Sequence, residues 1–213
     1  MKVAILLSGR INNNNNTYSN IINSISNVSP NDIDFFISYQ KNTKKGIVDN
    51  VTTMYKPKKI IENNEECFPV SHYKKAPETT SISVMCMYLS RLHLRDIFNE
   101  YVKTTNTKYD FVISSRMDIW LDGKLNSDTL LSHIKNNELC IPNPKFDYSG
   151  MNDQYAVGNL KTITQYLSVY DSLRDILDSG VLLHPETLLL EYLNRIAMPI
   201  HRFEMEYHIK RRF

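Results

Sequence analysis

The sequence predicts an α/β fold in which a central, mostly parallel mixed sheet is flanked by helices. Two observations support this prediction. Short apolar runs rich in β-forming residues, such as Lys2 to Leu7 and Ile33 to Tyr39, alternate with stretches of helical periodicity. This alternation is typical of parallel strands joined by right-handed crossovers. The run Phe111-Val112-Ile113 is apolar throughout, as expected for a strand buried on both faces.

The elements follow one another with recognisable boundaries. Further strands are expected at Lys59 to Ile61, Tyr109 to Ser115, Glu138 to Ile141 and Tyr155 to Val157, and strand-like sequence occurs after Pro199. Helices are expected at Tyr18 to Val28, Thr43 to Tyr55, Ser81 to Thr104, Asp128 to Asn136, Leu160 to Leu177 and from His184 onward. The asparagine run from Asn12 to Asn16 is interpreted as a flexible loop; alternatively, its residues cap the next helix.

The composition is that of an ordinary globular domain, with 42% hydrophobic and 23% charged residues in a chain of 213. We expect a single domain over residues 1–213. The net charge of +2 indicates no general affinity for nucleic acid. The basic end, Tyr207 to Arg212, suggests the N-terminal part of a longer polypeptide.

No targeting or membrane signal is expected. The apolar start, Val3 to Leu7, is too short for a signal peptide, and no apolar stretch is long enough to span a membrane. The three cysteines, Cys67, Cys86 and Cys140, form no CxxC pair and are interpreted as free thiols of a reducing compartment, the cytoplasm.

The most informative stretch follows the apolar strand Phe111 to Ile113. Ser114, Ser115, Arg116 and Asp118 are polar where that strand should end. Ligands of open α/β sheets bind beyond the carboxyl ends of the strands. A carboxylate there can hold a divalent cation, and an arginine can bind a phosphate. Alternatively, Arg116 and Asp118 form a structural ion pair that closes a turn, and this stretch alone does not distinguish the two.

The first expected strand ends in a second candidate segment, Ser8-Gly9-Arg10. A glycine allows close approach of the backbone to a ligand, and an arginine beside it can bind an anion. Many α/β proteins turn in this way for steric reasons only. The chain contains neither G-x-G-x-x-G nor a P-loop, so the two commonest nucleotide cradles are absent from the sequence.

A third candidate segment groups Asn152, Asp153 and Gln154 ahead of the apolar run Tyr155 to Val157. Carboxylate and amide groups of this kind can hydrogen-bond the hydroxyls of a sugar. The same residues are also typical of an Asx-rich turn without a ligand.

Four segments together carry a resemblance to a known family. They are Ala4 to Arg10, Ser115 to Trp120, Asn152 to Gly158 and His184 to Leu190. In this order they resemble the glycosyltransferases encoded by chlorella viruses, a family similar to GT-A glycosyltransferases. The resemblance covers essentially the whole chain. It implies a UDP-sugar donor, a Mn²⁺ (or Mg²⁺) ion, a glycan or glycoprotein acceptor such as a viral capsid-protein glycan, and the host-cell cytoplasm as the place of action.

The resemblance also implies roles for individual residues. The GT-A metal motif is usually Asp-x-Asp, and the matching place here contains a single carboxylate, Asp118. His208 matches the histidine that supplies another metal ligand in many relatives, and Lys210 matches the basic residue on the diphosphate. Asp153 would hold sugar hydroxyls or act as the base of the acceptor. The donor-binding candidates are Ser8, Gly9, Arg10, Arg116, Asn152 and Lys210.

Two other functions are compatible with the sequence. One is a non-catalytic module that binds a glycan or a nucleotide sugar, and the other is a sugar nucleotidyltransferase, since a fold does not determine a function.

Overall fold

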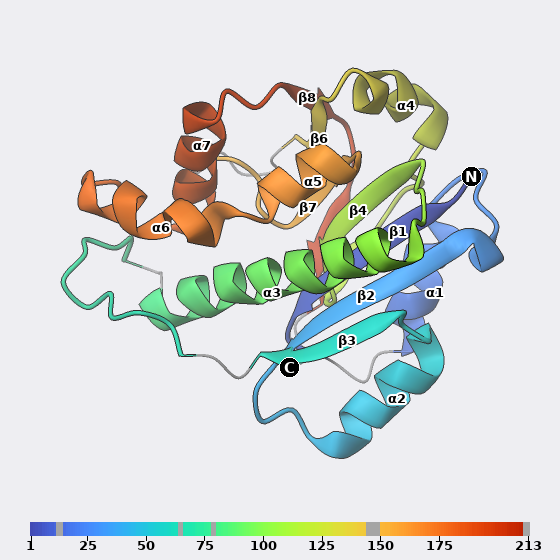
Figure 1. Ribbon diagram of the computed structural model, residues 1–213, viewed down its shortest axis with the longest axis horizontal. Coiled ribbons are helices and arrows are strands. Elements are labelled where there is room, and N and C mark those ends of the chain that lie inside the picture. The colour runs from blue at the N-terminus through green and yellow to red at the C-terminus, as the bar shows by residue number, and fades with distance from the viewer. Residues whose placement is uncertain (12–14, 64–65, 78–79, 144–149, 211–213) are drawn as a thin grey trace.

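A computed structural model describes residues 1–11, 15–63, 66–77, 80–143 and 150–210 (Figure 1). A seven-stranded sheet has the order β3-β2-β1-β4-β7-β6-β8, and β5 pairs with β9 in a separate two-stranded sheet. The strands are β1 (Val3–Gly9), β2 (Ile33–Gln40), β3 (Lys59–Asn63), β4 (Phe111–Arg116), β5 (Ile119–Leu121), β6 (Leu139–Pro142), β7 (Tyr155–Gly158), β8 (Ile200–Phe203) and β9 (Tyr207–Ile209). The α-helices are α1 (Asn15–Asn23), α2 (Lys45–Tyr55), α3 (Ser81–Thr105), α4 (Ser127–Lys135), α5 (Leu160–Tyr166), α6 (Val169–Asp178) and α7 (Pro185–Arg195).

The predicted α/β fold with a mostly parallel mixed sheet is confirmed. β1 pairs in parallel with both β2 and β4, and β3 continues the parallel set beside β2. β7 is antiparallel to both of its neighbours, β4 and β6, whereas β6 and β8 are parallel to each other. The carboxyl ends of β1, β2 and β4 therefore lie at the same edge of the sheet as the amino end of β7.

Helices cover both faces of the sheet, as the two apolar cores show. Successive side chains of a strand point to opposite faces of the sheet, so alternate residues of β1 pack into different cores. Ala4 and Leu6 pack in a core with α3, α5, α6 and α7, whereas Val3, Ile5 and Leu7 pack in a core with α1, α2 and α4. In Figure 1, α3 crosses one face of the sheet.

The expected long helix over Leu160 to Leu177 is wrong in one respect, because it is two helices. α5 ends at Tyr166, and α6 begins at Val169. Between them Ser168 donates its hydroxyl to the carbonyl of Thr164 at 2.7 Å, so the serine bonds back to the preceding turn. The break lets the buried residues of the two helices pack in one core at different angles (Figure 1).

Other boundaries also differ from the sequence expectation, and the helix expected over Tyr18 to Val28 ends at Asn23. α1 begins at Asn15, inside the expected asparagine loop, whose residues 12–14 lie outside the described residues. The strand-like C-terminal region contains two strands, β8 and β9, that belong to different sheets.

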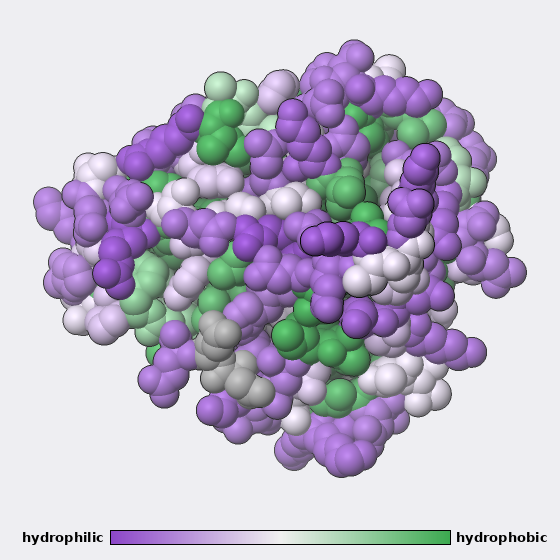
Figure 2. Space-filling model, in the orientation of Figure 1, coloured by the Kyte–Doolittle hydropathy of each residue, from purple (hydrophilic) through white to green (hydrophobic). Residues whose placement is uncertain are grey.

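Hydrophilic side chains cover most of the face seen in Figure 2, and hydrophobic groups form separated patches between them. Within the described ranges, none of the helices combines the length and the apolar character needed to cross a membrane.

Candidate functional site

The three polar segments singled out in the sequence converge at one edge of the main sheet. β4 ends at Arg116, and the backbone N–H of Arg116 donates to the carbonyl of Gln154 at 3.3 Å. Because β7 runs antiparallel to β4, Asn152 and Asp153, which precede β7, lie beside the end of β4. Ser8 stands opposite Arg116 in the pairing of β1 with β4. This edge is where ligands bind in open α/β sheets.

Gly9 is the last residue of β1. Gly9 has a φ of +112°, a conformation that residues with a side chain rarely adopt. A Cβ atom built on Gly9 would meet no heavy atom within 4 Å of the described residues. Ser8 is buried beside it, and Arg10 is exposed. The glycine therefore serves the turn of the backbone rather than the packing of a neighbour.

Arg116 and Asp118 form a two-pronged ion pair across the turn between β4 and β5. The Nε and Nη2 atoms of Arg116 each donate to one oxygen of Asp118 at 2.7 Å. Burial alone would lower the pKa of Arg116, but the hydrogen bonds and charge of Asp118 raise it. Arg116 and Asp118 therefore form the structural ion pair that the sequence left open as an alternative. It leaves a cation role possible, because an ionised carboxylate has about four lone-pair positions.

The small sheet brings the C-terminal candidates to Asp118. Trp120 pairs with His208, and the backbone N–H of Lys210 donates to the carbonyl of Asp118 at 2.8 Å. Because Trp120 and His208 stand opposite each other in the pairing of β5 with β9, their side chains share one face of this sheet. Asp118 lies in the turn before β5, and Lys210 directly follows β9. Ile119, on the opposite face, is fully buried in the core.

The side chains on that shared face have further partners. The Nζ atom of Lys210 lies 3.2 Å from the centroid of the Trp120 ring, a cation–π contact. The Nδ1 atom of His208 lies 3.1 Å from a carboxylate oxygen of Asp122. The joint binding of a metal by Asp118 and His208 stays a prediction.

Asn152 is buried and uses both ends of its amide. Its Nδ2 donates to the hydroxyl of Tyr207 at 2.7 Å, and its Oδ1 accepts from the backbone N–H of Gln154 at 2.9 Å. The second bond is the Asx turn that the sequence left open as an alternative. Burial raises the pKa of the Tyr207 hydroxyl, and the charge of Asp153 adds to the rise.

Asp153 is held by α3 and α5 rather than exposed to solvent. A carboxylate oxygen of Asp153 lies 3.4 Å from Nη2 of Arg91. Its backbone carbonyl accepts from the same nitrogen and from the hydroxyl of Tyr166, the latter at 2.9 Å. These bonds fix the start of the segment that leads into β7.

Arg91 is the residue that the sequence reasoning missed. It is 2% exposed, and its Nη1 atom has no hydrogen-bond partner among the described residues. The rings of Tyr88 and Tyr166 lie 5.5 and 5.6 Å from its Cζ atom. A signal was present in the sequence, because Arg91 interrupts the apolar stripe of α3 between Tyr88 and Leu94. A charged residue at a core position is almost always paired.

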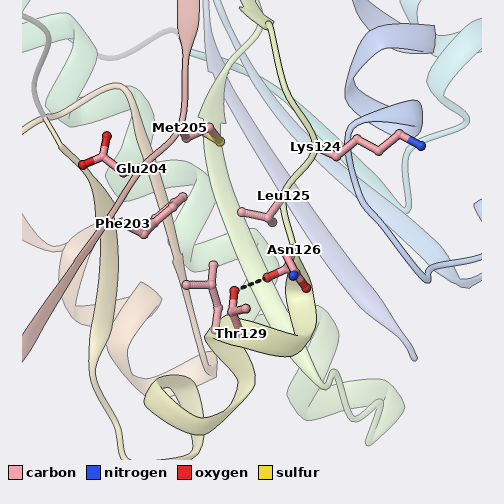
Figure 3. A pocket seen from close by; sticks show the side chains of 8 residues that line it. Lys124, Leu125, Asn126, Thr129, Phe203, Glu204 and Met205 are labelled. Carbon is pink, nitrogen blue, oxygen red and sulfur yellow. Dashed lines mark hydrogen bonds between the residues drawn. The ribbon is translucent and has the colours of Figure 1, made fainter.

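Two cavities among the described residues lie near the starts of α3 and α4. The larger, about 890 Å³, lies beyond β2 and beside the start of α3, and its walls include Lys41, Phe68, Val70, Tyr73, Ile82 and Met85. The smaller, about 170 Å³, lies between the start of α4 and the segment after β8 (Figure 3). Neither cavity is lined by any of the sequence-predicted site residues.

Comparisons with known proteins support the fold. No protein-family model and no curated protein matches the sequence. A solved structure from Desulfovibrio desulfuricans G20, described as a "putative nucleotide-diphospho-sugar transferase", is similar with a TM-score of 0.52 and 11% sequence identity. The similarity covers 96% of this chain and 80% of that chain. At this identity the two proteins share the arrangement of a mixed sheet flanked by helices.

Proposed function

We propose that this chain is a glycosyltransferase that moves a sugar from a UDP-sugar donor to a glycan acceptor. The observation that carries the proposal is the convergence of three separate polar segments at one sheet edge: Ser8 to Arg10, Arg116 to Asp118 and Asn152 to Asp153. The fold shared with a protein described as a nucleotide-diphospho-sugar transferase agrees with it.

The cationic side chains would bind the diphosphate of the donor. Arg10 is exposed beside the open turn at Gly9, Arg116 is half-buried at the end of β4, and Lys210 lies over Trp120. Negative charge grows on the β-phosphate as the bond between the sugar and UDP breaks. Positive groups held in place before the reaction stabilise that charge without having to reorganise.

A divalent cation, Mn²⁺ or Mg²⁺, would bind at this edge. Asp118 has oxygen lone pairs beyond those that bind Arg116, and the pairing of β5 with β9 brings the segment of His208 beside the turn that holds Asp118. Asp118 and His208 would hold the ion. When bound, it would supply positive charge to the diphosphate.

Asp153 would orient the sugar or accept the proton of the acceptor hydroxyl. Arg91 and Tyr166 hold its backbone and carboxylate in one position, which favours a role that needs a fixed geometry. The cavity of about 890 Å³ beyond β2 is our candidate for the acceptor, since its walls mix aromatic side chains with Lys41 and Lys75. We propose a capsid-protein glycan as the acceptor and a reducing cytoplasm as the setting, both on the sequence resemblance.

Calorimetric titration of UDP, GDP and CMP, each with Mn²⁺ and with EDTA, tests this function. We expect UDP to bind best and to require the cation. Equal UDP affinity in Mn²⁺ and in EDTA would contradict the metal part of the proposal. A protein that binds UDP-sugars but never transfers or hydrolyses them would instead be a binding module. Release of diphosphate from UTP and a sugar phosphate would identify a nucleotidyltransferase.

A further inference from the structure

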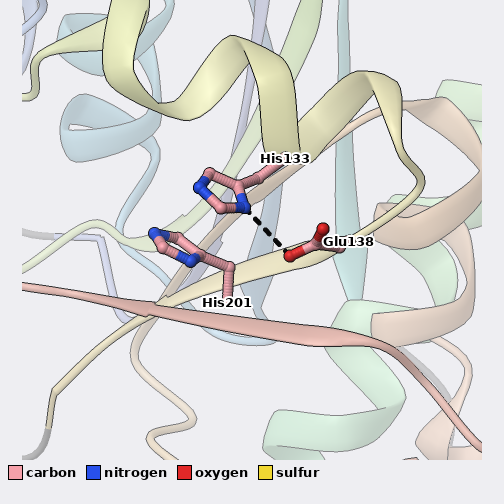
Figure 4. A group of neighbouring side chains, drawn as sticks. All are labelled: His133, Glu138 and His201. Atoms are coloured by element: carbon pink, nitrogen blue, oxygen red, sulfur yellow. Dashed lines mark hydrogen bonds and ion pairs between the residues drawn. The ribbon is translucent and has the colours of Figure 1, made fainter.

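A cluster of metal-binding side chains lies away from the candidate site. It consists of His133 near the end of α4, Glu138 just before β6, and His201 in β8 (Figure 4). Glu138 lies at the amino end of β6, and β6 is antiparallel to β7. β7 begins just after Asp153, at the edge of the sheet that carries the candidate site. The cluster of His133, Glu138 and His201, called the two-histidine cluster below, therefore lies at the opposite edge.

The three side chains are close enough to share one ion. One ligand atom from each lies within 4.8 Å of those of the other two, and Nδ1 of His133 lies 3.0 Å from Oε2 of Glu138. Two atoms that each bind a tetrahedral ion at about 2.0–2.2 Å lie about 3.3–3.6 Å apart. The His133–Glu138 pair is already near that separation, and His201 requires only a small movement.

The ring arrangement defines that movement. The imidazoles of His133 and His201 are stacked with centroids 3.5 Å apart and planes inclined by 15°. Nearly parallel rings cannot both direct a lone pair at one ion, so one ring must rotate about its side-chain bonds. Both histidines are partly exposed, which leaves room for the rotation.

The backbone beneath the two-histidine cluster is firmly held. Glu138 donates its backbone N–H to the carbonyl of His133 at 3.0 Å, and the pairing of β6 with β8 places His201 opposite Cys140. Ligands on a rigid scaffold lose little conformational freedom when they bind an ion.

We propose that His133, Glu138 and His201 form a Zn²⁺ site that fastens α4 to β6 and β8. Two imidazoles and one carboxylate suit Zn²⁺, whereas Mg²⁺ and Mn²⁺ prefer oxygen ligands. Water would complete the coordination. An ion that binds the folded chain and not the unfolded chain stabilises the fold, so Zn²⁺ raises the temperature of unfolding. The site is independent of the donor site and of the function proposed for it.

The test uses the full chain, stripped with EDTA and titrated with Zn²⁺ in the absence of any nucleotide. Competition with a chromophoric chelator measures affinity, and thermal unfolding measures stabilisation. We expect one Zn²⁺ per chain bound at these three residues. H133N, E138Q and H201N should each weaken Zn²⁺ binding by about 10-fold or more. Loss of a residue that only hydrogen-bonds to a metal ligand already costs about this much, and loss of a ligand should cost at least as much.

Matched controls separate this site from others. H72N removes an exposed histidine outside the two-histidine cluster, and D118N removes the proposed donor-site ligand, so both should bind Zn²⁺ as the wild type does. Circular dichroism in EDTA establishes that each variant is folded, and the three ligand variants are alternatives if one unfolds. The proposal is overturned if the wild type binds no Zn²⁺, or if the folded ligand variants bind it as tightly as H72N does.

Discussion

The carboxylate of Asp153 and the guanidinium of Arg91 form an ion pair in which both side chains are almost completely buried, with exposures of 6% and 3%. The pair joins α3 to the segment that carries the proposed catalytic residue. Removal of one partner would leave the other charged and buried, which is far more costly than the loss of a surface pair. A test of Asp153 in catalysis must therefore separate chemistry from folding.

We predict that Asp153→Ala lowers the free energy of unfolding by about 3–5 kcal/mol, because Arg91 loses its buried counter-charge. Asp153→Asn keeps the volume and a hydrogen-bond acceptor, so it should be more stable than Asp153→Ala. Turnover of Asp153→Asn should still fall by about 10²-fold or more, with UDP affinity near the wild-type value. Urea unfolding, calorimetry and a transfer assay measure the three quantities.

A surface pair provides the control for that experiment. Lys45 and Asp49 are 88% and 57% exposed, so Lys45→Ala should change the free energy of unfolding by about 1 kcal/mol or less. If Asp153→Asn transfers sugar at the normal rate, Asp153 has no part in the chemistry and its role is to hold α3.

Asp118→Asn tests the metal role against the ion-pair role. We predict that UDP binding no longer responds to Mn²⁺, because the amide lacks the charge that a hard cation requires. The stability should fall by about 1–3 kcal/mol, because Asp118 is 14% exposed and the neutral amide weakens its two-pronged pair with Arg116. Much earlier thermal unfolding with intact Mn²⁺-dependent UDP binding would show that the pair with Arg116 is its only role.

Trp120 offers a direct optical signal for the donor site. It is the only tryptophan in the chain, and the ammonium group of Lys210 lies over its ring. If Lys210 moves to a diphosphate, the emission of Trp120 should change on addition of UDP. Lys210→Ala should remove most of that change and weaken UDP binding, whereas Lys210→Arg should retain part of both. Calorimetry establishes the UDP concentration that saturates the protein. If the emission spectrum of Trp120 is unchanged at that concentration, Lys210 lies outside the diphosphate site.

Gly150 supports the site through close packing against α7. A Cβ atom there would lie 2.5 Å from Cβ of Glu186 and 2.6 Å from its backbone carbon, so the backbone must shift. We predict that Gly150→Ala costs about 1–3 kcal/mol of stability.

Gly46→Ala is the control. Gly46 lies in α2, and a Cβ atom built on it would meet no heavy atom of the described residues within 4 Å, apart from its chain neighbours and its own helix backbone. That substitution should be neutral or stabilising by up to about 1 kcal/mol. Equal stability of the two variants in urea would contradict the packing argument.

Three tyrosines around the ion pair of Arg91 and Asp153 predict a loss of stability in alkali. Burial raises the pKa of Tyr88, Tyr166 and Tyr207 in the folded chain. In the unfolded chain these tyrosines ionise with a pKa of about 10. Their contribution to the free energy of unfolding is therefore complete below about pH 10, and it is lost as the pH rises through their pKa values in the folded chain. Urea unfolding from about pH 8 to about pH 11 should show the decline, and Tyr88→Phe should reduce its slope. A free energy of unfolding that is constant over this range would contradict the assignment.

Local patterns predicted much of the fold and part of the candidate site. The sequence shows the apolar runs of β1 and β4 and the periodic apolar stripe of α3. Buried positions recur at short intervals along a strand or a helix, and these positions must be apolar. Asp118 and Gly9 were identified because polar or glycine residues directly follow such strands. The break between α5 and α6 was not predicted, since apolar spacing continues across it and Ser168 alone marks the boundary.

The sequence by itself determined most of the strands and helices, and which polar residues follow the buried strands. Only the tertiary structure decided that β7 runs antiparallel and so brings Asn152 and Asp153 to the end of β4. It also decided that Arg91 pairs with Asp153, and that His201 joins His133 and Glu138. Each of these contacts joins residues far apart in the chain. Their proximity depends on how whole elements pack, which no periodicity within a single element encodes.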